Sequence, residues 1–202
     1  MYRVTLTIAF IFYVVQIEAG NASFEDLYNL LNTSSRIHAY ASSYMMYMYG
    51  DSLTCINYFT LQVSNRVFKA KFRFRAGHNW FDKEAYGKLG NDTETGEPYM
   101  EPLFWPGTDP NAYENEGGFS KQRERPQSAK KYLKFYDNDN HCGVFTLRRN
   151  GKQHCELHVW RRNIIEEGPY YYYLNESCMV SYHQICGEEK PTVTLYTGAC
   201  TN

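Results

Sequence analysis

The first periodic stretch after residue 20 has the pattern of a helix. Apolar residues recur there with the spacing of one helix face, at Phe24, Leu27, Tyr28 and Leu31. Ser23 precedes this run, and Asp26 follows Ser23 by three residues. This pairing is typical of a helix N-terminus. Near the other end of the chain, residues 177–186 place three residues at spacings of four, again on one side of a helix, and Gly187 follows as a stop signal. The pattern predicts one short helix near each end.

Between the two helices the apolar period is two, as in β-strands. In 68–75, apolar residues alternate with the cations Lys69, Lys71, Arg73 and Arg75; this cationic face is either a docking patch or a solvated surface. Further strands are expected at 131–136, 142–148, 154–161 and 192–197, with a hairpin turn at Asn150-Gly151. Residues 86–128, rich in glycine and proline, predict short strands separated by long loops. This order predicts a mainly all-β fold, an eight-stranded antiparallel barrel with both helices outside.

The start of the chain carries an export pattern. Arg3 precedes an apolar run through Ile17, and Ala19 and Gly20 then offer a cleavage point. The run is shorter than the roughly 18–20 residues that a bilayer span needs, so we expect residues 1–20 to be a signal peptide and residues 21–202 one secreted domain without a membrane anchor. The six cysteines all lie in that domain and predict three disulfides, among 15 possible pairings. Four sequons predict glycosylation, at Asn21, Asn32, Asn91 and Asn175.

Composition and motifs exclude several classes of function. A formal net charge of −1 gives no basic footprint for nucleic acid. Aromatic residues make up 17% of the chain and either line a ligand cavity or fill a β-rich core. No nucleophile, phosphate-binding or zinc-protease motif is present, so neither an enzyme nor a cofactor is predicted. On one strand His154 and His158 would lie about 13 Å apart, too far to share zinc. Asp137 opens a stretch that lacks the glycine and glutamate of a calcium loop.

Several segments together resemble the tick salivary histamine-binding lipocalins. They are DSLTCINYF at 51–59, NHCGVFTL at 140–147, CELHVW at 155–160, NESCMVSYHQIC at 175–186 and TGACTN at 197–202. The resemblance is anchored by all six cysteines and is weak between residues 77 and 126. It implies three pairings: Cys55 with Cys200, Cys142 with Cys178 and Cys155 with Cys186. The last two would pin the C-terminal helix to two neighbouring strands.

The same pairings orient the strand that carries Cys155. Its odd-numbered side would face the helix, so Glu156, His158 and Trp160 would point into the barrel. The resemblance implies that Glu156 matches a carboxylate that binds a cationic amine. A buried carboxylate is costly unless it is paired, and an internal arginine or tyrosine partner is the alternative role.

The chain also departs from the amine-binding pattern. Met46 stands where those proteins carry another aspartate, Tyr49 replaces a tryptophan, and no acid lies around Tyr132. Histamine, as a dication, requires more than one carboxylate. Tyr44, with Met46, Met48, Tyr132 and Phe135, suits an amphipathic lipid mediator instead.

The function expected from the sequence is sequestration, by a monomer, of a small host mediator at a feeding site, with suppression of host defence. The resemblance and Glu156 favour a biogenic amine such as histamine or serotonin. The alternatives are a fatty-acid-derived mediator, of the leukotriene or thromboxane class, and inhibition of a host protein of complement or clotting. The candidate ligand-binding residues are Glu156, Trp160, His158, Tyr49, Tyr44 and Tyr132.

Overall fold

A computed structural model of the chain describes residues 22–48, 50–106, 130–149, 151–167 and 171–200. The expected signal peptide, the sequon at Asn21 and the candidate residue Tyr49 lie outside these residues.

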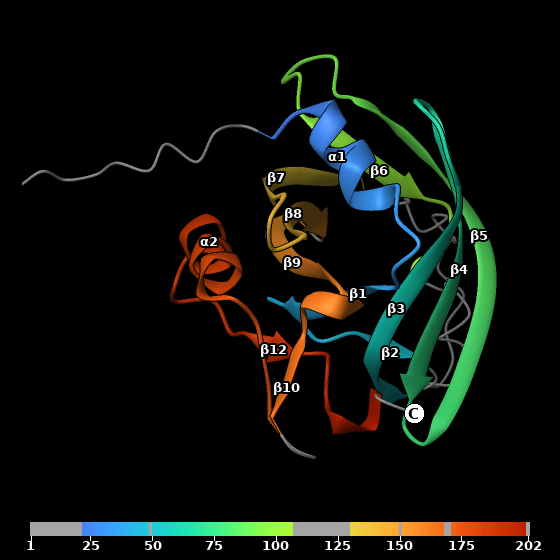
Figure 1. Cartoon of the computed structure of the whole chain (residues 1–202), viewed down its shortest axis with the longest axis vertical. Coiled ribbons are helices and arrows are strands. Elements are labelled where there is room, and N and C mark those ends of the chain that lie inside the picture. Colours follow the sequence, from blue (N-terminus) through green and yellow to red (C-terminus); the bar gives the residue numbers. More distant parts are fainter. Residues whose placement is uncertain (1–21, 49, 107–129, 150, 168–170, 201–202) are drawn as a thin grey trace, which may run out of the picture.

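The described strands close into a barrel (Figure 1). Its eight members are β1 (Ile37–Ser42), β3 (Asp51–Val63), β4 (Val67–Ala76), β5 (Asn79–Asn91), β6 (Pro98–Pro102), β7 (Lys131–Asp137), β8 (Cys142–Arg149) and β9 (Lys152–Trp160). From β3 to β9 each strand pairs antiparallel with the next, β9 pairs with β1, and β1 returns to β3 with Ile37 opposite Tyr58. The eight-stranded antiparallel barrel expected from the sequence is therefore confirmed, with the up-and-down order of a lipocalin.

Short strands extend this ring among the described residues. β2 (Tyr47–Met48) pairs with β3, and β12 (Val193–Thr194) pairs with β1, so only part of the strand expected at 192–197 forms. β10 (Ile165–Glu167) and β11 (Tyr171–Tyr173) make a separate hairpin. Two single turns of 3-10 helix follow β9 and β12, at Arg161–Asn163 and Gly198–Cys200.

Strand β4 alternates as its sequence predicts. Phe68, Ala70, Phe72 and Phe74 are buried, and the four cations lie on the other face. These cations are partly engaged by β5: Lys69 forms a 2.8 Å ion pair with Glu84, and the Arg73 guanidinium lies 4.5 Å from the centroid of the Trp80 ring. The cationic face is therefore solvated but already paired in part with its own sheet.

The expectation of short strands from residue 86 is wrong for the first part of that stretch. β5 continues unbroken to Asn91 in spite of Gly87 and Gly90. Gly87 lies directly opposite Phe68, whose ring occupies the space in which a side chain at 87 would stand. The glycine here makes room for an aromatic ring in the core and does not mark a loop.

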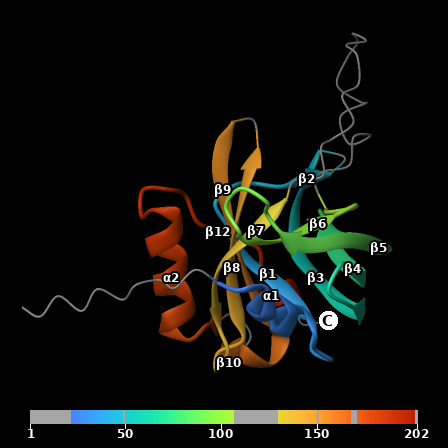
Figure 2. The same ribbon diagram turned by 90° about the horizontal axis from the view of Figure 1, so that it is seen from above.

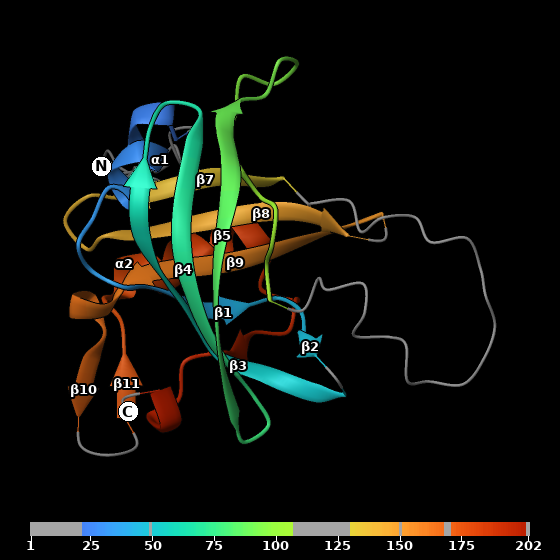
Figure 3. The same cartoon turned by 90° about the vertical axis from the view of Figure 1, so that its right-hand side faces the viewer.

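The two helices lie outside the strand ring in different places (Figures 2 and 3). α1 (Phe24–Leu31) begins with the expected capping box, formed by Ser23 and Asp26. It contacts β3 on one side of the barrel and β6 and β7 on the other, and its three buried leucines join the interior core, so it closes one end. α2 (Glu176–Cys186) packs against the outer face of β8 and β9. Neither helix has the length and apolar character needed to cross a membrane.

The three expected disulfides are all present. Cys142–Cys178 and Cys155–Cys186 join β8 and β9 to α2, and Cys55–Cys200 ties β3 to the C-terminal segment across 145 residues of chain. A cross-link over so long a loop restricts the unfolded chain strongly, by up to about 5 kcal/mol in the chain-entropy account.

We predict that Gly87→Ala lowers the free energy of unfolding by about 1–3 kcal/mol, because the new methyl group overpacks a closed core. Its Cβ would lie 2.1 Å from Cε1 of Phe68, which is buried and cannot move aside. Gly90→Ala on the same strand is the control, since its nearest neighbour is the hydroxyl end of half-buried Tyr99. Urea denaturation measures both, and equal losses would contradict this packing.

Candidate functional site

Strand β9 carries the candidate site on its inner face. Cys155, Leu157 and Val159 pack with α2 residues in an outer cluster, so Glu156, His158 and Trp160 point the other way, as the sequence predicts. Glu156 and His158 are both 0% exposed, which places a carboxylate and an imidazole fully inside the protein.

Three side chains donate hydrogen bonds to the Glu156 carboxylate, two from elsewhere in the chain and one from β9 itself. Its Oε1 accepts a 2.5 Å hydrogen bond from the Tyr44 hydroxyl, just after β1. Its Oε2 accepts from Lys131 Nζ of β7 at 2.5 Å and from His158 Nε2 at 2.8 Å. A buried carboxylate needs such partners, and the expected internal partner is present as a tyrosine together with a lysine instead of an arginine.

His158 extends the network across the barrel as a neutral ring. Burial lowers the pKa of its imidazole, although the neighbouring Glu156 opposes that shift. Because Nε2 donates to the carboxylate, Nδ1 is left to accept a 2.9 Å hydrogen bond from the Tyr58 hydroxyl of β3. The chain of hydrogen bonds thus runs from β3 through β9 to β7.

Opposite charges balance at the centre of this network. Burial alone would raise the pKa of Glu156, but the Lys131 charge and the His158 hydrogen bond outweigh it and hold the pKa at about 2. Burial lowers the pKa of Lys131 to about 8 against the attraction of Glu156. At neutral pH both groups are charged, and the site carries no net charge.

An indole ring completes the site. Trp105, which follows β6 and is 3% exposed, stacks on the His158 ring with centroids 5.4 Å apart and planes within 8°. Lys131 Nζ lies 3.0 Å from the centroid of the same indole, in cation–π geometry. Phe72 and Tyr58 meet Trp105 edge-on, at 5.6 and 5.9 Å.

The structure brings together only some of the expected site residues. Glu156, His158 and Tyr44 form one network. Trp160 lies at the end closed by α1, where its Nε1 donates to the Leu30 carbonyl. Tyr132 points out of the barrel, and its hydroxyl donates to Asp92, because Lys131 and Leu133 take the inward positions of β7.

Three members of the network were missed: Lys131, Trp105 and Tyr58. The alternation of β7 could have found Lys131, since it shares a face with Leu133. Tyr58 lies on β3 two residues from Ile56, and both belong to the interior core. Trp105 follows β6 in a short segment with no period to read.

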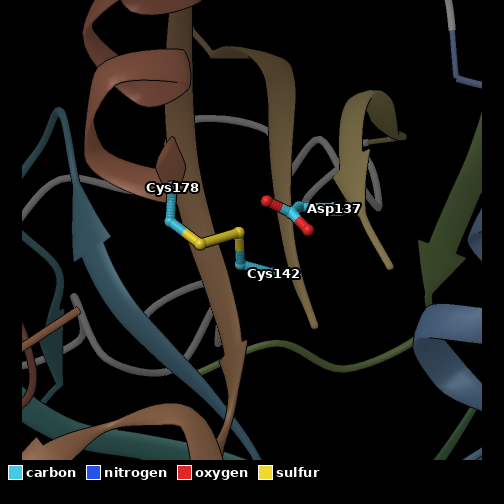
Figure 4. Close-up of side chains that lie close together, drawn as sticks. All are labelled: Asp137, Cys142 and Cys178. Atoms are coloured by element: carbon cyan, nitrogen blue, oxygen red, sulfur yellow. A yellow bond between two sulfur atoms is a disulfide. The ribbon is translucent and has the colours of Figure 1, made fainter. Parts of the chain in front are cut away.

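A second cluster joins a carboxylate to two sulfur atoms (Figure 4). Asp137, Cys142 and Cys178 have the composition of a metal site, but the sulfurs form a disulfide and cannot act as thiolate ligands. Asp137 accepts hydrogen bonds from Asn140 at 2.7 Å and from Ser177 at 2.8 Å. The cluster fastens the β7–β8 turn to the start of α2.

Three of the sequon asparagines fall within the described residues. Asn32, Asn91 and Asn175 are all exposed, so each is accessible for the expected glycosylation.

A sequence profile described as "Tick histamine binding protein" matches residues 50–202, well over half of the chain. The chain belongs to the tick histamine-binding protein family. Among solved structures it is similar to Japanin from Rhipicephalus appendiculatus bound to cholesterol, with 11% identity, a TM-score of 0.49, and coverage of 81% of this chain and 93% of that one. Among curated proteins, none matches. The description of this family names the binding of a ligand.

We predict that Glu156→Gln costs about 3–5 kcal/mol of unfolding free energy, because it leaves Lys131 buried without its counter-charge. The double variant Lys131→Met, Glu156→Gln should regain at least half of that loss, since it buries no charge. Chemical denaturation of the wild type, both single variants and the double variant gives the coupling. Additive losses would mean that the two groups do not form a pair.

Acid should weaken the wild type more than the double variant. The Glu156 pKa is about 2 in the folded chain against an ordinary value of 4.5. A depressed carboxyl pKa adds stability above pH 4.5, and this is lost as pH falls from about 4.5 to about 2. Denaturation across this window should show a steeper decline for the wild type. Parallel curves would contradict the assigned charge state, because other acids are common to both proteins.

Proposed function

We propose that the protein is a secreted, monomeric and glycosylated salivary lipocalin that binds and sequesters a small host inflammatory mediator inside its barrel. It suppresses host defence at the feeding site by stoichiometric trapping, without turnover. The observation that carries this proposal is a polar network deep in an aromatic barrel, in a chain of the tick histamine-binding family. Three disulfides and the apolar start of the chain support export.

The charge of the site bears on the class of mediator. In the described chain, Lys131 and Glu156 are the only buried groups that carry a full charge at neutral pH, and they neutralise one another. A biogenic amine is the ligand that the sequence favours. However, the Glu156 carboxylate, which would bind the amine, already accepts hydrogen bonds from three donors. A second cation beside Lys131 would meet repulsion in a poorly screened interior.

The chemical character of this interior favours a fatty-acid-derived mediator. Its hydrocarbon chain would contact buried aromatic and methionine side chains, which include Phe72, Met100 and Trp105. Such contacts need no ligand cation, and each buried methylene contributes about 0.8 kcal/mol. We therefore propose a leukotriene-type ligand ahead of histamine and serotonin.

Calorimetric titration of the secreted protein with a leukotriene, histamine and serotonin tests this function. We expect one leukotriene per chain and no heat of binding from either amine. Saturation by histamine would overturn the lipid assignment and restore the amine. If none of the three binds, mediator trapping fails, and inhibition of a host protein becomes the better account.

Tryptophan fluorescence locates the ligand. The chain has three tryptophans, and Trp105 alone lies in the Glu156 network. Leukotriene should change the emission of the wild type and of Trp80→Phe, but not that of Trp105→Phe. A change retained in Trp105→Phe would place the ligand elsewhere.

A further inference from the structure

We infer that Lys131 is a built-in ammonium ligand that occupies an amine-binding site of the protein and thereby sets its specificity against free amines. The inference deepens the proposed function, on which it rests, by naming the residue that selects the ligand class. It comes from two contacts of one nitrogen atom and from its burial.

The surroundings of Lys131 Nζ are those of a bound amine. A carboxylate oxygen of Glu156 lies at 2.5 Å, and the face of the Trp105 indole lies with its centroid at 3.0 Å. A carboxylate and an aromatic face are the two groups that recognise ammonium ions in desolvated pockets. The Lys131 side chain is 2% exposed, so water does not share this role.

The rest of the site serves the carboxylate and not the lysine. Tyr44 and His158 donate to Glu156 from other directions, and Tyr58 holds His158 in the tautomer that can donate. These groups would keep Glu156 oriented and charged for any cation in the position of Nζ. The site thus has all the groups that bind an amine, and the Lys131 ammonium group from β7 occupies it.

A tethered ligand excludes a free one by competition and by charge. The lysine is held at its site by the strand, so its effective concentration is far above that of a dissolved amine. A free ammonium that entered without displacing it would place two cations side by side in a low-dielectric interior. Removal of the Lys131 side chain should therefore uncover an amine site.

Lys131→Ala is the test, with n-propylammonium as the probe, because this ion reproduces the three carbons and the nitrogen removed beyond Cβ. We expect n-propylammonium to raise the Tm of Lys131→Ala by several degrees more than n-propanol does, and to leave the Tm of the wild type unchanged. Histamine affinity should rise at least about tenfold over the wild type, the size expected for a charge-assisted contact. Where Lys131→Ala does not fold, Lys131→Thr serves for the histamine titration, because threonine suits a strand and also removes the side chain beyond Cγ.

Two controls isolate the site. Lys134→Met removes the same charge from the same strand, but Lys134 pairs with Glu97, away from the Glu156 network, so no amine should bind. The double variant Lys131→Ala, Glu156→Gln should lose the response to n-propylammonium.

The outcomes separate this inference from the proposed function. An equal response to n-propanol and n-propylammonium, or a response that survives Glu156→Gln, would overturn the role of Lys131. Leukotriene uptake by the wild type would still support the function in that case. Conversely, amine uptake by Lys131→Ala supports the inference even where the wild type binds none of the three mediators.

Discussion

A lysine and a glutamate, both charged and both shielded from water, meet inside the barrel, and the interior is arranged around them. Removal of each ion from water costs several kcal/mol, which a pair offsets only with good geometry and further hydrogen bonds. Here Oε2 of Glu156 lies 2.5 Å from Lys131 Nζ, and Tyr44 and His158 supply the remaining donors. The pair therefore depends on β1, β7 and β9 all being in register, and it links the closure of the sheet to the chemistry of its interior.

The same ion pair determines the charge that a ligand encounters inside the barrel. The description of the family by histamine binding suggests an interior with a negative charge that attracts a cation. Glu156 alone would supply that negative charge. Lys131 cancels that charge and takes the face of Trp105 as well. An interior that is aromatic and electrically neutral selects by apolar contact. One lysine on one strand thus accounts for the preference that we propose for a lipid mediator over an amine.

The alternation of residues along single strands predicts part of the candidate site. The alternation around Cys155 was enough to place Glu156 and His158 inside, because a cysteine bonded to a helix fixes which face of its strand points outward. The same alternation on β7 places Lys131 and Leu133 inside the barrel and Tyr132 outside it. The expectation that Tyr132 lines a cavity rested on its aromatic ring and not on this alternation. Trp105 could not have been placed, because a non-periodic segment after β6 carries it into the barrel through tertiary contacts alone.

The charge state of Lys131 is the most direct test of this account. In a ¹⁵N-labelled sample near neutral pH, NMR of the lysine side chains should show one slowly exchanging Nζ signal at the shift of a charged ammonium, absent from Lys131→Met. That signal should keep its charged shift until the pH approaches about 8. A neutral amine at pH 7, or exchange with water as fast as that of surface lysines, would contradict a buried ion pair at the centre of the barrel.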